Sequence, residues 1–106
     1  MDELVELVNR IWEASGFETT VEEREGRTLV RAERADRPAP DLIYPRPNEP
    51  GDPPVERMDL FFFNNLYEPH EIARPYLVTV GEVAPGARAL AVESRLEIID
   101  GQNLAT

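Results

Sequence analysis

The chain of 106 residues contains no cysteine, no lysine and a single histidine. The absence of cysteine excludes disulfide bonds and thiolate metal sites, and it agrees with a cytoplasmic location. The N-terminal segment MDELVELVNR is acidic and lacks the charged-then-apolar pattern of a secretory signal. No apolar run approaches the roughly 20 residues that a membrane-spanning helix needs. We therefore expect a cytoplasmic protein that does not contact a membrane.

All eleven basic residues are arginines, and they face 21 acidic residues, which gives a net charge of -10. A high negative charge resists aggregation and non-specific adhesion to nucleic acid. Two origins stay open: a halophile, in which salt screens the self-repulsion, and a GC-rich genome that favours arginine codons. The length and the 42% of hydrophobic residues predict one domain over residues 1–106.

The first part of the chain has the pattern of a helix followed by a hairpin. Residues 2–15 carry one apolar stripe at helical spacing, and Gly16 lies where a left-handed helix cap is expected. Residues 17–22 alternate between two faces, and a turn at Glu25-Gly26 leads to a second strand over residues 27–34.

Seven of the ten prolines fall within residues 38–54, which predicts a stiff loop. Only the apolar residues 42–44 look like a strand within this loop. The sequence IYPRP (43–47) would end that strand, because its two prolines lack backbone N–H groups.

The second part of the chain predicts a helix over about 53–67, a buried strand over 76–80, a helix that opens at Pro85 and a short strand over 96–100. The order of elements is therefore α-β-β-β-α-β-α-β. This order predicts an α/β fold of mixed α+β character, with a mixed central sheet flanked by helices.

The helix predicted over 53–67 is apolar on two sides, so it needs burial on two sides. Its second apolar stripe consists of Leu60, Phe63 and Tyr67. This stripe has three interpretations: core beneath the proline-rich loop, a homodimer interface, or a strand mistaken for a helix. We predict the interface, because aromatic residues are enriched in interface cores and two-fold dimers are the commonest oligomer.

The last third of the chain, YLVTVGEVAPGARALAVESRLEIIDGQNLA (76–105), resembles the end of the Mrr-type restriction endonuclease domain of the PD-(D/E)XK nuclease superfamily. In that family an apolar strand ends in a Thr-Gly turn, a helix opens with proline, and a short strand ends in Ile-Asp-Gly. The matching positions are Val78, Thr79, Gly81, Pro85, Ala87, Arg88, Leu90, Ala91, Ile99, Asp100, Gly101 and Leu104. The resemblance implies a restriction-endonuclease-like fold.

The resemblance also implies three catalytic positions: Asp on the second strand, then Glu or Gln, one residue, and Lys on the third. Carboxylates there hold Mg²⁺, which stabilises charge on the phosphate and acidifies a water molecule. In this chain the three positions fall on Thr28, Tyr44 and Arg46. None is retained, and an arginine keeps its proton and cannot act as a base. We therefore expect no catalytic residue, no bound metal and no cofactor.

Weaker candidates remain. Glu33, Asp36 and Asp41 could form a displaced metal site, although solvated loop charges are the simpler interpretation. His70 could act as a base, although a surface role in its proline-flanked loop is simpler. The arginines of residues 24–46 could bind phosphate, but the glutamates among them favour ion pairing instead.

The sequence thus favours a non-catalytic nuclease-fold protein that acts as a homodimeric structural or interaction module. One alternative is a Mg²⁺-dependent DNA endonuclease, or a subunit of a DNA-processing complex, with displaced ligands. A second alternative is a module that binds DNA without cleaving it, which the net charge disfavours.

Overall fold

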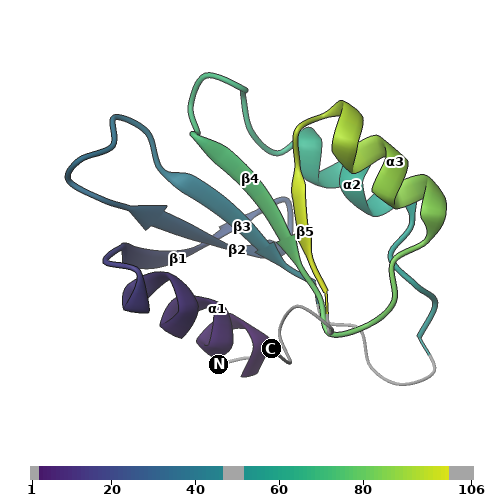
Figure 1. Ribbon diagram of the computed structural model, residues 1–106, viewed down its shortest axis with the longest axis horizontal. Helices are drawn as coiled ribbons and strands as arrows, with labels where there is room; N and C mark the ends of the chain where they lie inside the picture. The colour runs from purple at the N-terminus through teal and green to yellow at the C-terminus, as the bar shows by residue number, and fades with distance from the viewer. Residues whose placement is uncertain (1–2, 47–51, 101–106) are drawn as a thin grey trace.

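The computed structural model describes residues 3–46 and 52–100, and it has the predicted order of elements (Figure 1). The elements are α1 (Glu3–Ala14), β1 (Glu18–Arg24), β2 (Arg27–Glu33), β3 (Asp41–Pro45), α2 (Arg57–Asn64), β4 (Arg74–Val78), α3 (Pro85–Glu93) and β5 (Glu97–Ile99). No helix within the described ranges is long and apolar enough to cross a membrane.

The sheet has five strands whose spatial order follows the chain, β1-β2-β3-β4-β5. β1, β2 and β3 pair antiparallel, whereas β3, β4 and β5 pair parallel. The β1–β2 turn has positive φ at both Glu25 (51°) and Gly26 (76°), which is the two-residue hairpin geometry that suits twisted strands. The parallel pairs need crossovers, which α2 and α3 provide. The predicted mixed sheet flanked by helices is confirmed.

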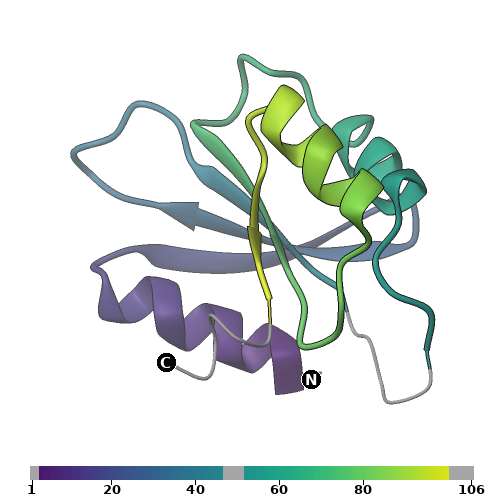
Figure 2. The ribbon, with the colours of Figure 1, turned by 45° about the vertical axis from the view of Figure 1, so that its right-hand side comes forward.

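Two helical layers cover the two faces of the sheet (Figures 1 and 2). On one face, α1 packs on a cluster that includes Trp12, Val30 and Ile43. On the other face, α2 and α3 cover a second cluster that includes Leu42 and Tyr44. β3 is buried throughout, as a central strand with both faces covered should be.

The helix α2 begins four residues later than the sequence predicts, and the reason is Val55. Val55 is extended and bridges Val83, and its N–H donates to the carbonyl oxygen of Glu82 at 2.8 Å. An extended residue there cannot belong to the first turn of a helix. The cap is therefore a reciprocal pair of Glu56 and Asp59.

Some sequence predictions fall on residues that the structure does not describe. They concern residues 47–51 of the proline-rich loop and the matches at Gly101 and Leu104, which lie outside the described ranges.

Candidate functional site

The end of β3 is the place where the resemblance puts the catalytic residues, and Tyr44 is buried there. Tyr44 is 5% exposed, and its ring lies 5.6 Å from that of Phe63 on α2. β3 ends at Pro45, as predicted, and the N–H of Arg46 then donates to the carbonyl oxygen of Val78 at 2.8 Å. Tyr44 is therefore held by a contact with α2, and the backbone of Arg46 is held by a hydrogen bond to β4.

The side chain of Arg46 forms an ion pair with Asp59 of α2. The distance from Arg46 Nε to Asp59 Oδ1 is 3.0 Å, and the side chains are 19% and 23% exposed. The other carboxylate oxygen of Asp59 accepts the N–H of Glu56 at 2.9 Å. Both oxygens of Asp59 are thus engaged, one in the ion pair and one in the helix cap.

Thr28 lies on the other face of the sheet, so the three predicted positions do not converge. Side chains alternate along a strand, and Leu29 belongs to the cluster of Tyr44 whereas Val30 belongs to the cluster beneath α1. Thr28 therefore shares the face of Val30. Thr28 and Tyr44 thus lie on opposite faces of the sheet.

Arg27, one of the arginines that the sequence offered as phosphate-binding candidates, contacts an aromatic ring of α2. Its guanidinium carbon lies 4.7 Å from the centre of the Phe62 ring, a cation–π distance. Burial raises the pKa of the Tyr44 hydroxyl, while the nearby charges of Arg27 and Arg46 partly oppose the shift and Asp59 adds to it. Two guanidinium groups and one carboxylate therefore lie close enough to this phenol to affect its pKa.

These residues do not fit a magnesium site. Mg²⁺ prefers carboxylates and water, and here Asp59 is held by Arg46 and by its helix cap. Within residues 3–46 and 52–100, no group of three or more histidine, cysteine, aspartate or glutamate side chains could hold a metal ion.

The displaced carboxylates do not come together either. Glu33 lies 4.0 Å from the guanidinium of Arg31. Asp36 accepts two hydrogen bonds of 2.6 Å from Arg34, and this contact lowers its pKa to about 2. Asp41 is 2% exposed and accepts a hydrogen bond from the indole of Trp12 at 3.4 Å. Each carboxylate has its own partner, so the displaced metal site is not assembled.

The other polar candidates have surface positions. His70 is exposed in the turn between α2 and β4. Most arginines of the hairpin and of the segment that follows it form ion pairs, as the glutamates among them led us to expect. The pairs are Arg24 with Glu22 and Glu71, Arg31 with Glu22 and Glu33, Arg34 with Asp36, and Arg37 with Asp41.

The predicted interface stripe is part of the core of the single chain. Leu60 and Phe63 have no accessible surface. Tyr67 is half-buried, packs edge-on against Phe63 at 5.3 Å and donates to Asn64 Oδ1 at 2.9 Å. These side chains cover the sheet, which leaves Leu60 and Phe63 unable to contact a second copy. The core interpretation is correct for this stripe.

Comparison with known proteins agrees with the architecture. No family model and no curated protein matches the sequence. Among solved structures, one similar chain is the MspJI restriction endonuclease in complex with a 27-mer oligonucleotide, with a TM-score of 0.66 and 14% identity over 96% of this chain. Another is the protein of unknown function AF1548, with a TM-score of 0.62 and 20% identity over 89% of this chain.

The alignments span 25% of the MspJI chain and 54% of the AF1548 chain, so this chain corresponds to only part of each protein. At these identities the likeness shows a restriction-endonuclease-like fold and nothing about activity.

Proposed function

We propose that this chain is a nuclease-fold module of the Mrr type that has lost metal-dependent cleavage and acts through contacts with other macromolecules. The observation that carries the proposal is the pair Tyr44 and Arg46 at the end of β3, where Arg46 is bound to Asp59 at 3.0 Å. The matches at the end of the chain, from Val78 to Leu104, support the Mrr assignment.

Two properties of the pair and one of the whole sequence support the loss of cleavage. Tyr44 is buried against Phe63, so it is not placed to hold a hydrated cation. Arg46 cannot replace the lysine, because a guanidinium does not release its proton to act as a base. The 106 residues include no lysine that could take this role.

A cleavage assay tests the proposal. Single- and double-stranded DNA are incubated with the protein and Mg²⁺ or Mn²⁺, at low and at molar salt, and we expect no products above the blank. Two variants serve as matched probes: Asp59→Asn at the end of β3, and Asp36→Asn in a surface ion pair. Cleavage by the wild-type chain that is lost in Asp59→Asn and kept in Asp36→Asn would overturn the proposal.

Homodimerisation remains part of the proposal, but it requires a different surface. Met58 and Phe61 lie one turn apart on α2 and are 76% and 53% exposed. We expect sedimentation velocity to show self-association that Phe61→Glu weakens and that Val92→Glu, at an 81% exposed position on α3, does not. A mass of one chain at all accessible concentrations and salts would refute the dimer.

A second candidate function is DNA binding without cleavage, and Arg27 favours it. Arg27 is exposed and stacks on Phe62, and within the described ranges no ion pair involves it. MspJI, a similar chain in fold, was solved with an oligonucleotide. Tight binding measured by fluorescence anisotropy, steeply weakened by salt and lost in Arg27→Gln but kept in Arg10→Gln, would favour this candidate.

A further inference from the structure

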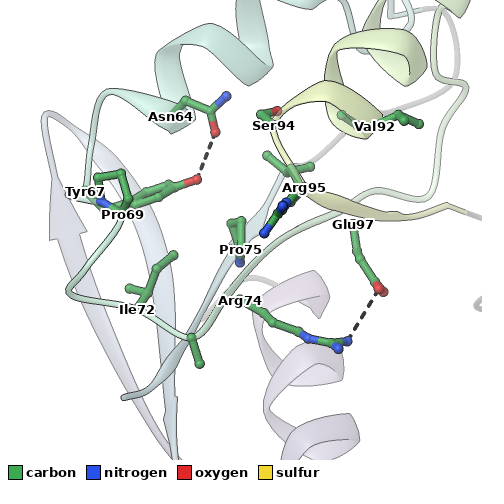
Figure 3. A pocket seen from close by; sticks show the side chains of 13 residues that line it. Asn64, Tyr67, Pro69, Ile72, Arg74, Pro75, Val92, Ser94, Arg95 and Glu97 are labelled. Carbon is green, nitrogen blue, oxygen red and sulfur yellow. Dashed lines mark hydrogen bonds and ion pairs between the residues drawn. The ribbon is translucent and has the colours of Figure 1, made fainter. Parts of the chain in front are cut away.

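A hollow of about 840 Å³ lies at the opposite end of the parallel strands from Tyr44 and Arg46. It opens where the ends of α2 and α3 come over the starts of β4 and β5 (Figure 3). Its apolar lining includes Ile72 and Leu96, which are 7% and 4% exposed. This volume is within the range of about 300–1,000 Å³ that small-molecule sites occupy.

Arg95 occupies a backbone position at this hollow that normally belongs to glycine. The helix α3 ends in a complete Schellman motif, in which the N–H of Leu96 donates to Ala91 O at 2.9 Å and that of Arg95 to Val92 O at 3.4 Å. The residue at this position must adopt the left-handed backbone conformation, and Arg95 does so with a φ of 56°. A side chain is less favourable than glycine in this conformation, because its Cβ atom crowds the backbone. The unfavourable backbone points to a function for the side chain.

Arg95 lines the hollow and is exposed to solvent there. Figure 3 shows it reaching from the end of α3 toward Pro75, with Tyr67 and Ile72 beyond. Within residues 3–46 and 52–100, none of the ion pairs involves Arg95. The hollow contains a second arginine, Arg74, but Glu97 pairs with it at 3.5 Å. The hollow therefore has one uncompensated positive charge in a chain whose net charge is -10.

The other polar groups of the hollow are neutral and already engaged. The Tyr67 hydroxyl donates to Asn64 at 2.9 Å, and the Ser94 hydroxyl donates to Leu90 O at 2.7 Å. Burial raises the pKa of Tyr67 to about 12, so its phenol stays uncharged and does not repel an anion. Among the charged groups of the lining, as described, Arg95 is thus the one without an ion-pair partner, and it is open to an anionic ligand.

We propose that this hollow binds a small organic anion, in which one carboxylate pairs with Arg95 and an apolar body packs on Ile72, Pro75 and Leu96. A planar carboxylate matches the fork of a guanidinium with two parallel hydrogen bonds. α2 and α3 both end at the hollow, and their negative C-terminal ends oppose an anion, so the positive charge of Arg95 favours a ligand with a single negative charge. A nucleotide with several phosphate charges suits this environment less well. The inference is independent of the proposed function.

NMR titration with 2-naphthoate tests the proposal, with 2-naphthylmethanol as the uncharged analogue and AMP as the phosphate probe. We expect saturable shifts of the backbone amides of Tyr67, Ile72 and Arg95. Loss of one charged hydrogen bond weakens binding at least about tenfold, so the alcohol and Arg95→Gln should each show this loss. Arg10→Gln removes the same charge from α1 on the other face of the sheet and should bind as the wild type does.

Arg95→Gly separates a ligand-binding role from a structural one. Glycine relieves the left-handed backbone, so the melting temperature should rise by about 4 °C while binding of 2-naphthoate is lost. The proposal is overturned if Arg95→Gly melts below the wild type, since Arg95 would then serve stability. It is also overturned if naphthoate binds equally to Arg95→Gln, if it does not bind the wild type, or if AMP binds as tightly through Arg95.

Discussion

Replacing Phe63 with alanine provides the sharpest test of where α2 faces. Phe63 has no accessible surface, and its ring lies 5.6 Å from that of Tyr44 and 5.3 Å from that of Tyr67. If it belongs to the core of the single chain, its loss lowers the free energy of unfolding. If it belongs to an interface, its loss changes association and leaves the monomer nearly intact.

The expected loss is large relative to the stability of a domain of this size. A buried Phe→Ala change costs about 3–5 kcal/mol, which combines lost transfer free energy with the cavity left behind. The two aromatic contacts contribute about 0.5–1.5 kcal/mol each to this total. A domain of this length is stable by about 5–15 kcal/mol. The variant therefore loses about a fifth or more of its stability, and the milder Phe63→Leu keeps the test usable if Phe63→Ala does not fold.

Urea unfolding followed by the fluorescence of Trp12 measures this loss. Trp12 is the sole tryptophan and packs in the cluster on the opposite face, so it reports cooperative unfolding rather than a local change at residue 63. Phe61→Ala is the matched control: it is the same substitution on the same helix at a 53% exposed position, and it should cost about 1 kcal/mol or less. Equal losses for the two variants would refute the assigned orientation of α2.

Three further predictions follow from single contacts. Asp41→Ala leaves the buried indole N–H of Trp12 without its acceptor, so we expect a loss of about 1–3 kcal/mol in urea unfolding and a shifted emission maximum; an unchanged spectrum would contradict the contact. Asp59→Ala removes both the partner of Arg46 and the helix cap and should cost about 1–2 kcal/mol, whereas Asp59→Asn keeps an acceptor for the cap and should cost less. The pKa of Asp36 falls to about 2 from an ordinary 3.8, so its stabilising contribution is complete above 3.8 and is lost as the pH falls toward 2; acid unfolding followed by circular dichroism should show this loss in the wild type but not in Asp36→Asn.

Much of the fold could be predicted because local pattern and tertiary structure agree. The stripe of α1 and the buried run at β3 each have one periodicity that suits one element. The start of α2 could not be predicted, because Val55 and the prolines before it fit a helical first turn equally well. Val55 instead bridges Val83, a contact 28 positions along the chain that no local propensity contains.

The candidate site was harder to predict than the fold for a related reason. Leu29 and Val30 are both fully buried, so hydrophobicity alone does not say which of the two shares a face with Tyr44. A one-residue change of phase moves every side chain to the other face, so the sequence does not decide whether Arg27 or Thr28 lies on the side of Tyr44. Likewise, an apolar stripe such as Leu60 and Phe63 looks the same in a sequence whether a sheet or a second copy covers it.

If the chain has lost a nuclease site, as proposed above, the packing at the end of β3 would make that site hard to regain. A metal site needs carboxylates exposed to water, but position 44 holds a side chain that is 5% exposed and packed on Phe63. A glutamate at position 44 would lose that packing and would lie near Asp59, where two carboxylates disfavour each other's ionised forms. A lysine in place of Arg46 would lose the guanidinium geometry toward Asp59, to which α2 is tied. On the proposed function, the residues that exclude cleavage are therefore the same residues that hold α2 on the sheet, and each step back toward catalysis would first reduce stability.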